Sequence, residues 1–198
     1  LEIEVTKKQP LLKSYVWVWG SSHDNRLDDQ NNIIPNGLLP GSYDEEGYPD
    51  FVIPANEKNH VETIMFTLPD NFPETAIFGI GTHMHYLGKN MEVTLHRKDP
   101  KEGQKKKECL IATPNYNFYY QRMYYYDTGY PGGRWRVPRI KGGDTIEFKC
   151  TFDNTINNPF LAYALEEYDD INEPIDVRLG PNSLDEMCLA LIAVLNKS

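Results

Sequence analysis

The sequence lacks any run of about 18 apolar residues, so it predicts no membrane-spanning helix. Cationic side chains are also scarce, because 20 Lys and Arg stand against 29 Asp and Glu and the net charge at pH 7 is −9. Phosphate binding needs a basic surface, and this balance therefore argues against nucleic acids and anionic membranes as partners. Only three cysteines are present, and no segment repeats or is low in complexity.

What is present indicates an all-β protein. Gly and Pro number 14 each and interrupt every candidate helix but one, while 13 Tyr and 8 Phe exclude a disordered chain. About eight short strands with no helices between them predict an antiparallel jelly-roll β-sandwich. The alternating, strand-like runs are 1–6, 15–19, 60–68, 76–86, 91–97, 108–112, 116–126, 145–153 and 189–195.

We expect a single domain over residues 1–198, with most of its structure in residues 51–196. Residues 1–50 contribute a strand and then a long loop, Ser21–Asp50, rich in Asp, Asn, Gly and Pro. Loops of this length inside a compact domain are uncommon and are often functional. The Lys-rich segment Lys98–Lys107 is interpreted as a solvated hairpin tip.

Residues 183–195 are ambiguous. Apolar side chains recur with helical spacing, and Ser183 with Glu186 would form a capping box. From this local pattern alone, a helix and a strand are about equally favoured.

His83 and His85 are the first candidate for chemistry. Side chains at positions i and i+2 of a strand leave the same face, so both imidazoles could hold one metal ion as neutral ligands. His23, His60 and His96 show no ligand-like spacing that would complete a zinc site. For a bare His-x-His, two histidines on a solvated strand face are the commoner interpretation, and the pair alone is a weak signal for a metal.

Met187 and the cysteines are the second candidate. A thioether is a soft ligand suited to Cu(I), although a lone Met more often fills a gap in a core. A bridge between Cys150 and Cys188 would close a loop of about 38 residues and leave Cys109 free. The count also permits three reduced, buried cysteines.

Four motifs occur here in the order found in one family: His83-Met-His-Tyr-Leu-Gly88, Tyr116-Asn-Phe-Tyr-Tyr-Gln121, Lys149-Cys-Thr-Phe-Asp-Asn154 and Gly180-Pro-Asn-Ser-Leu-Asp-Glu-Met-Cys188. Over about residues 52–195 the chain resembles the C-terminal domain of the ascorbate-dependent type II copper monooxygenases. That family includes the peptidylglycine α-hydroxylating and dopamine β-monooxygenases and bacterial homologues.

The resemblance implies that His83, His85 and Met187 hold one copper ion at which oxygen is activated. It also implies a Cys150–Cys188 disulfide beside the Met ligand, and a strand rather than a helix for the segment that carries them. We therefore predict a strand there, against the local pattern. Met187 and Cys188 would then point to opposite faces.

The sequence also departs from the family. Animal members have a second, three-His copper domain that supplies an electron, and this chain is too short to contain one. They place polar substrate-binding side chains just after the Met-Cys pair, where this chain has Leu189, Ala190 and Leu191. A peptide carboxylate or a catecholamine is therefore not the expected substrate.

These features predict a copper monooxygenase-like enzyme that uses O₂ to hydroxylate a C–H bond of a small-molecule substrate. The electron donor would be ascorbate or a redox domain or subunit missing from this chain. The alternatives are a copper-binding or assembly module without turnover and a metal-free interaction sandwich. A disulfide and an opening at Leu1 favour an extracellular or periplasmic protein with its leader removed.

Overall fold

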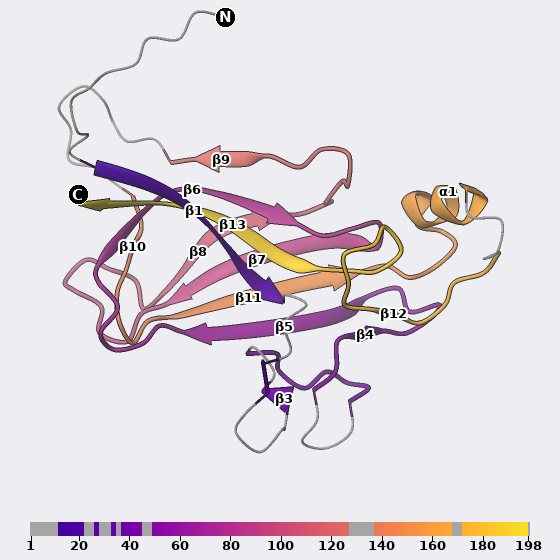
Figure 1. Cartoon of the computed structure of the whole chain (residues 1–198), viewed down its shortest axis with the longest axis horizontal. Helices are drawn as coiled ribbons and strands as arrows, with labels where there is room; N and C mark the ends of the chain where they lie inside the picture. The colour runs from indigo at the N-terminus through magenta and orange to yellow at the C-terminus, as the bar shows by residue number, and fades with distance from the viewer. Residues whose placement is uncertain are drawn as a thin grey trace, which may run out of the picture.

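The structure is a computed structural model that describes residues 12–21, 26–27, 33–34, 37–44, 49–126, 137–167 and 172–197. Two antiparallel sheets face each other (Figure 1). The first has the order β1 (Leu12–Ser21), β13 (Cys188–Lys197), β6 (Thr75–His83) and β10 (Arg139–Ile140), with β9 (Met123–Tyr125) also paired to β6. The second has the order β5 (His60–Thr67), β11 (Thr145–Phe152), β7 (Gly88–His96) and β8 (Lys107–Thr113).

Smaller elements flank the two sheets. The two-residue strands pair as β12 (Val177–Arg178) with β4 (Val52–Ile53), and as β2 (Arg26–Leu27) with β3 (Ile33–Ile34). One helix, α1 (Pro159–Glu167), lies at the end of the molecule toward which β6 runs (Figure 1). Among the described residues no helix is long and apolar enough to cross a membrane.

The core lies between the facing sides of the sheets. Along β11 the side chains alternate, so that Phe148 and Phe152 are fully buried while Lys149 is exposed. The facing strand β13 is instead covered on both sides over most of its length, with Ile192, Ala193 and Val194 all buried. Alternation with period two is the pattern by which the sequence predicts a half-buried strand, and here it sorts apolar side chains into one interior.

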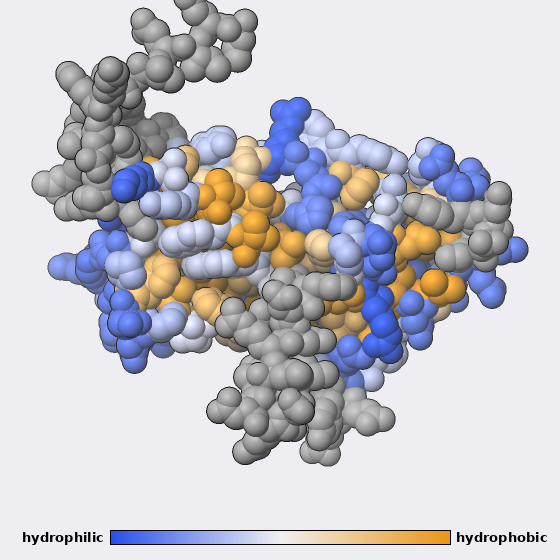
Figure 2. All heavy atoms as spheres, in the orientation of Figure 1, coloured by the Kyte–Doolittle hydropathy of each residue, from blue (hydrophilic) through white to orange (hydrophobic). Residues whose placement is uncertain are grey.

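Aromatic side chains close one side of the sandwich. Trp17 and Trp19 of β1 stack with ring centroids 5.2 Å apart. Trp19 lies 5.7 Å from Phe66 of β5, and Trp17 lies 5.8 Å from Phe72 in the loop that follows. These ring contacts join the edge strand of the first sheet to the second sheet. Apolar side chains are also visible on the outer surface over β1 and β13 (Figure 2).

A disulfide joins the two sheets near the end where β13 begins. Cys150 of β11 and Cys188 of β13 are bonded, and both are fully buried. The third cysteine, Cys109, is free and exposed on β8. The disulfide predicted from the resemblance is therefore present.

The all-β antiparallel sandwich is confirmed, and so is the strand in the ambiguous segment, where β13 forms from Cys188 onward. Two expectations are wrong. Residues 116–122 are not strand, because β9 covers only three residues of the predicted run. A helix is also present at α1, where Asn158 accepts a hydrogen bond from the Phe160 amide (3.1 Å) and caps the first turn. The predicted strand 1–6 lies outside the described residues, and the jelly-roll connectivity and single domain remain predictions.

Replacing both Cys150 and Cys188 with Ala should lower the free energy of unfolding by about 3–4 kcal/mol, because a loop of about 38 residues is released in the unfolded chain. Urea unfolding monitored by circular dichroism measures this difference. Cys109→Ala is the control and should leave stability unchanged, since Cys109 is exposed and unbonded. Equal stability of the double variant and the wild type would contradict the prediction.

Candidate functional site

The two histidines lie at the end of the sandwich where β6 ends. His83 is the last residue of β6, and His85 follows in the turn that leads to β7. Their ring centroids are 5.2 Å apart and the rings are nearly perpendicular, with an interplanar angle of 80°. His83 is half-buried, whereas His85 is only 7% exposed. The imidazoles of His83 and His85 therefore lie next to each other.

Gln121 fixes the tautomer of His83. Its Oε1 lies 2.6 Å from Nδ1 of His83, and its Nε2 donates to the carbonyl of Phe118 (2.8 Å). The second bond orients the amide so that its oxygen faces the histidine. Because Oε1 can only accept, Nδ1 of His83 carries a proton, and in the neutral ring the lone pair is therefore on Nε2.

A backbone carbonyl does the same for His85. Nδ1 of His85 lies 2.8 Å from the carbonyl oxygen of Asp185, which again can only accept. Burial lowers the pKa of His85, and the nearby His83 lowers it further. His85 is therefore neutral near pH 7, and its Nε2 is also a free lone pair.

Met187 directly precedes β13, the strand that pairs with β6 in the same sheet. In the ladder between β6 and β13, Leu189 pairs with His83. Continuing this register by two residues in each direction would place Met187 opposite His85. The bond from His85 to Asp185 shows that the segment before β13 does lie against this histidine. Met187 is half-buried at this end of the sheet.

Glu186 holds together the segment that carries His85 and the segment that carries Met187. Its carboxylate is fully buried and accepts the backbone N–H groups of His85 (2.8 Å), Leu87 (2.7 Å) and Met187 (3.0 Å). Burial raises the pKa of Glu186 to about 8, while these backbone donors act in the opposite direction. One side chain thus satisfies donors on both sides of the site, and removing it would leave them buried without partners.

The segment between β8 and β9 covers the histidines. The Tyr116 hydroxyl is buried, accepts the amide N–H of Met84 (2.9 Å) and donates to the Met84 carbonyl (2.5 Å). The ring of Phe118 lies 6.3 Å from that of His85 and 4.5 Å from that of Tyr86. The predicted Tyr116–Gln121 motif therefore forms a wall of the site rather than a strand.

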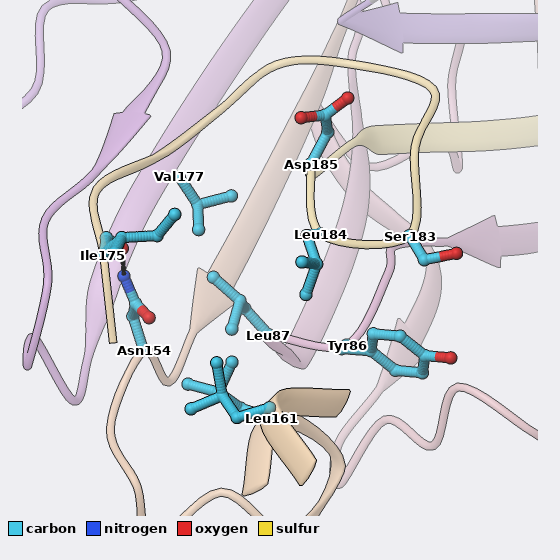
Figure 3. Close-up of a pocket in the computed structure, with 10 residues that line it drawn as sticks. Tyr86, Leu87, Asn154, Leu161, Ile175, Val177, Ser183, Leu184 and Asp185 are labelled. Carbon is cyan, nitrogen blue, oxygen red and sulfur yellow. Dashed lines mark hydrogen bonds between the residues drawn. The ribbon is translucent and has the colours of Figure 1, made fainter. Parts of the chain in front are cut away.

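Apolar side chains close the back of the site (Figure 3). A cavity of only about 10 Å³ separates Leu87 and Leu184 from Leu161 of α1, and Figure 3 shows all three side chains pointing into it. This space is at the lower limit for one water molecule. The carboxylate of Asp185 accepts two hydrogen bonds from Asn182, one from the backbone amide (3.0 Å) and one from the side-chain amide (2.7 Å). Helix α1 therefore packs, through Leu161, against the segments that carry Leu87 and Leu184.

The site brings two imidazole rings from one short segment next to the segment that carries Met187. Among the described residues, no three His, Cys, Asp or Glu side chains are grouped so that they could hold a metal ion. A site made of two His and one Met would not count as such a group, because Met is not one of these four residue types. The remaining histidines lie elsewhere: His60 pairs with Glu62 (2.7 Å), His96 pairs with Glu147 (2.5 Å), and His23 lies outside the described residues.

Sequence reasoning quoted Gln121 and Glu186 within motifs but assigned neither of them a role in the site. Glu186 had a usable signal, since it stands two residues before Cys188 and an extended chain turns both side chains to the same face. Gln121 had none, because its partner lies 38 residues away in the sequence.

Glu186→Gln should lower the free energy of unfolding by about 1–3 kcal/mol, because an amide offers one acceptor oxygen and places N–H donors against N–H donors. Chemical denaturation measures the change. Glu166→Gln, on the exposed side of α1, is the matched control and should have no effect. A Glu186→Gln protein as stable as the wild type would show that this carboxylate does not hold the two segments together.

Gln121→Leu should release His83 from its Nδ1–H tautomer, while His85 keeps its own because its partner is a backbone carbonyl. Long-range ¹H–¹⁵N NMR of the imidazole rings, at a pH where both are neutral, distinguishes the tautomers. Gln104→Leu, in an exposed turn, is the control. If His83 retained the Nδ1–H tautomer in Gln121→Leu, the hydrogen bond to Gln121 would not be what sets the tautomer of His83.

No protein-family model matches this chain, and no curated protein matches it either. The resemblance to the copper monooxygenases therefore rests on the four motifs in the sequence. The arrangement of the histidines, Gln121, Glu186 and Met187 is the independent ground on which a function can be argued.

Proposed function

We propose that the chain binds one copper ion through His83, His85 and Met187 and acts as a copper-dependent monooxygenase domain. The observation that carries the proposal is the pair of histidines whose Nδ1 atoms are both taken by acceptors, which leaves Nε2 available on two rings with centroids 5.2 Å apart. The substrate would be a small molecule with a reactive C–H bond. The electron donor would be ascorbate or a redox domain or subunit outside this chain.

The residues present suit copper rather than a harder ion. Two neutral imidazoles with a thioether are soft ligands that favour Cu(I), whereas Zn²⁺ and Mg²⁺ prefer thiolate, imidazole or oxygen sets. Outer partners that fix ligand tautomers are typical of metal sites, and Gln121 and the Asp185 carbonyl are such partners. A bound copper ion would supply the redox chemistry with O₂ that no side chain supplies.

The protein's own contribution is to hold and orient the ligands. Gln121 and the Asp185 carbonyl accept from Nδ1–H of the two rings, so the Nε2 atoms are the ones that would face the metal. Glu186 keeps His85 and Met187 together, and the disulfide at Cys188 anchors the segment next to Met187 in the core. The ligands therefore need little rearrangement to bind a metal.

A second candidate function is copper binding without turnover, for storage, delivery or assembly. The observation that favours it is the apolar sequence after the Met-Cys pair, where Leu189 and Ala190 are buried and offer no polar side chain to a substrate. The same three ligands would serve this function. Oxygen consumption separates the two candidates.

The buried disulfide supports an extracellular or periplasmic location, because such bonds form and persist in oxidising compartments. The copper chemistry proposed here fits that location, since ascorbate and soluble redox partners are the reductants it would need.

Anaerobic loading with Cu(I), followed by X-ray absorption spectroscopy, tests the ligand set. We expect one copper per chain with two nitrogen ligands and one sulfur ligand. His83→Ala and His85→Ala should abolish copper binding. Met187→Ile should lower the affinity for Cu(I) by at least roughly 10–100-fold, the loss typical of removing an outer partner of a ligand, and should lower the affinity for Cu(II) less. Met65→Ile, on β5 in the other sheet, is the control.

Equal Cu(I) affinity in the wild type and in Met187→Ile, or a preference for zinc with no sulfur ligand, would contradict the proposal. With the copper-loaded protein, ascorbate-dependent oxygen uptake above that of His83→Ala would support the enzyme. Uptake equal to that variant across candidate substrates would leave the copper-binding module as the function.

A further inference from the structure

A second, larger cavity lies at the end of the sandwich away from the histidines. It has a volume of about 590 Å³ and lies between the turn that joins β7 to β8 and the start of β10. This is the opposite end of β6, because Arg139 pairs with Ala76 whereas His83 ends the strand. At about 3.3 Å per residue, the two sites are roughly 25 Å apart. They are therefore separate sites.

The charge of this cavity is opposite to that of the protein. Four cationic side chains line it, namely Arg97, Lys105, Lys107 and Arg139, with Glu108 as the acidic one. The whole chain carries a net charge of −9. Hydrophilic side chains gather at this end of the molecule in Figure 2. A concave surface lined by one sign of charge concentrates the field and attracts counter-ions.

These cations differ in how far acids within the protein neutralise them. Arg97 is buried, forms an ion pair with Glu108 and donates to the Arg139 carbonyl (2.7 Å). It therefore joins the two walls of the cavity and forms a fixed floor. The others are looser: Lys107 lies 3.7 Å from Glu147, and Arg139 lies 3.5 Å from Glu74.

Lys105 forms no ion pair within the part of the chain that the structure describes. Together with Lys107 it brings positive charge from the hairpin side of the cavity, and Arg139 brings it from the β10 side. An anion with acidic groups at both ends could contact both walls. A monovalent anion could contact only one.

We infer that this cavity binds a small anion with two or more phosphate or carboxylate groups. The inference does not rest on copper binding, because the site shares no residue with the histidine pair. It adds to the sequence-based interpretation of Lys98–Lys107 as a solvated hairpin tip, since two of its exposed lysines also line a cavity of ligand size.

Cys109 provides a direct reporter. It lines the same cavity and is exposed, while the other two cysteines are bonded to each other and buried. An uncharged reagent such as N-ethylmaleimide should therefore modify this thiol alone. A bound anion should slow that modification.

The experiment measures the binding of pyrophosphate and of citrate by calorimetry, together with the rate of Cys109 alkylation. We expect saturable binding, slower alkylation, and at least about tenfold weaker binding in Lys105→Glu/Lys107→Glu, because charge-assisted hydrogen bonds are lost. Lys13→Glu/Lys58→Glu makes the same change in net charge at exposed positions elsewhere, and should change affinity by less than about threefold.

Preferential binding of pyrophosphate would identify a phosphate ligand, and preferential binding of citrate a carboxylate ligand; either supports the site. The inference is overturned if neither anion binds or slows alkylation, or if both double variants weaken binding equally. Copper loading is measured on the same wild-type and variant proteins before either anion is added and should be the same in all of them, so failure here and failure of the copper proposal are read separately.

Discussion

The candidate site depends on one carboxylate that has no contact with water. Glu186 is buried under the end of the sandwich, and an ionisable group in that place must be surrounded by donors. The available donors are backbone N–H groups from the turn after β6 and from the segment before β13. Satisfying the carboxylate therefore fixes two segments that are about one hundred residues apart in the sequence.

The disulfide and this carboxylate act on neighbouring positions but constrain different things. The Cys150–Cys188 bond fixes β13 to the facing sheet, which sets the position of the strand within the sandwich. Glu186 sets the path of the chain just before that strand, where no sheet hydrogen bonds to β6 remain. Met187 lies between them, so its backbone is held from both sides.

The sequence predicted the sandwich because alternation in runs such as 145–152 is a local property of a half-buried strand. It could not settle β13 locally, because the apolar positions of 184–195 fit a helix equally well and pairing with β1 and β6 decides the outcome. The missed helix α1 had a readable signal in Asn158-Pro159 followed by strong helix formers. The role of Gln121 was not readable, since it depends on a turn of the chain that brings it onto His83.

The order of strands in the first sheet has a consequence for how the protein is made. β13 is the last strand in the sequence, yet it lies between β1 and β6 and pairs with both. During synthesis β1 and β6 emerge without the strand that separates them, so this sheet can form only after residues 188–197 have left the ribosome. Pairings this distant in sequence form slowly. Until then Met187 and Cys188 remain apart from His83, His85 and Cys150, so the disulfide and the hydrogen bonds of Glu186 are among the last contacts to form.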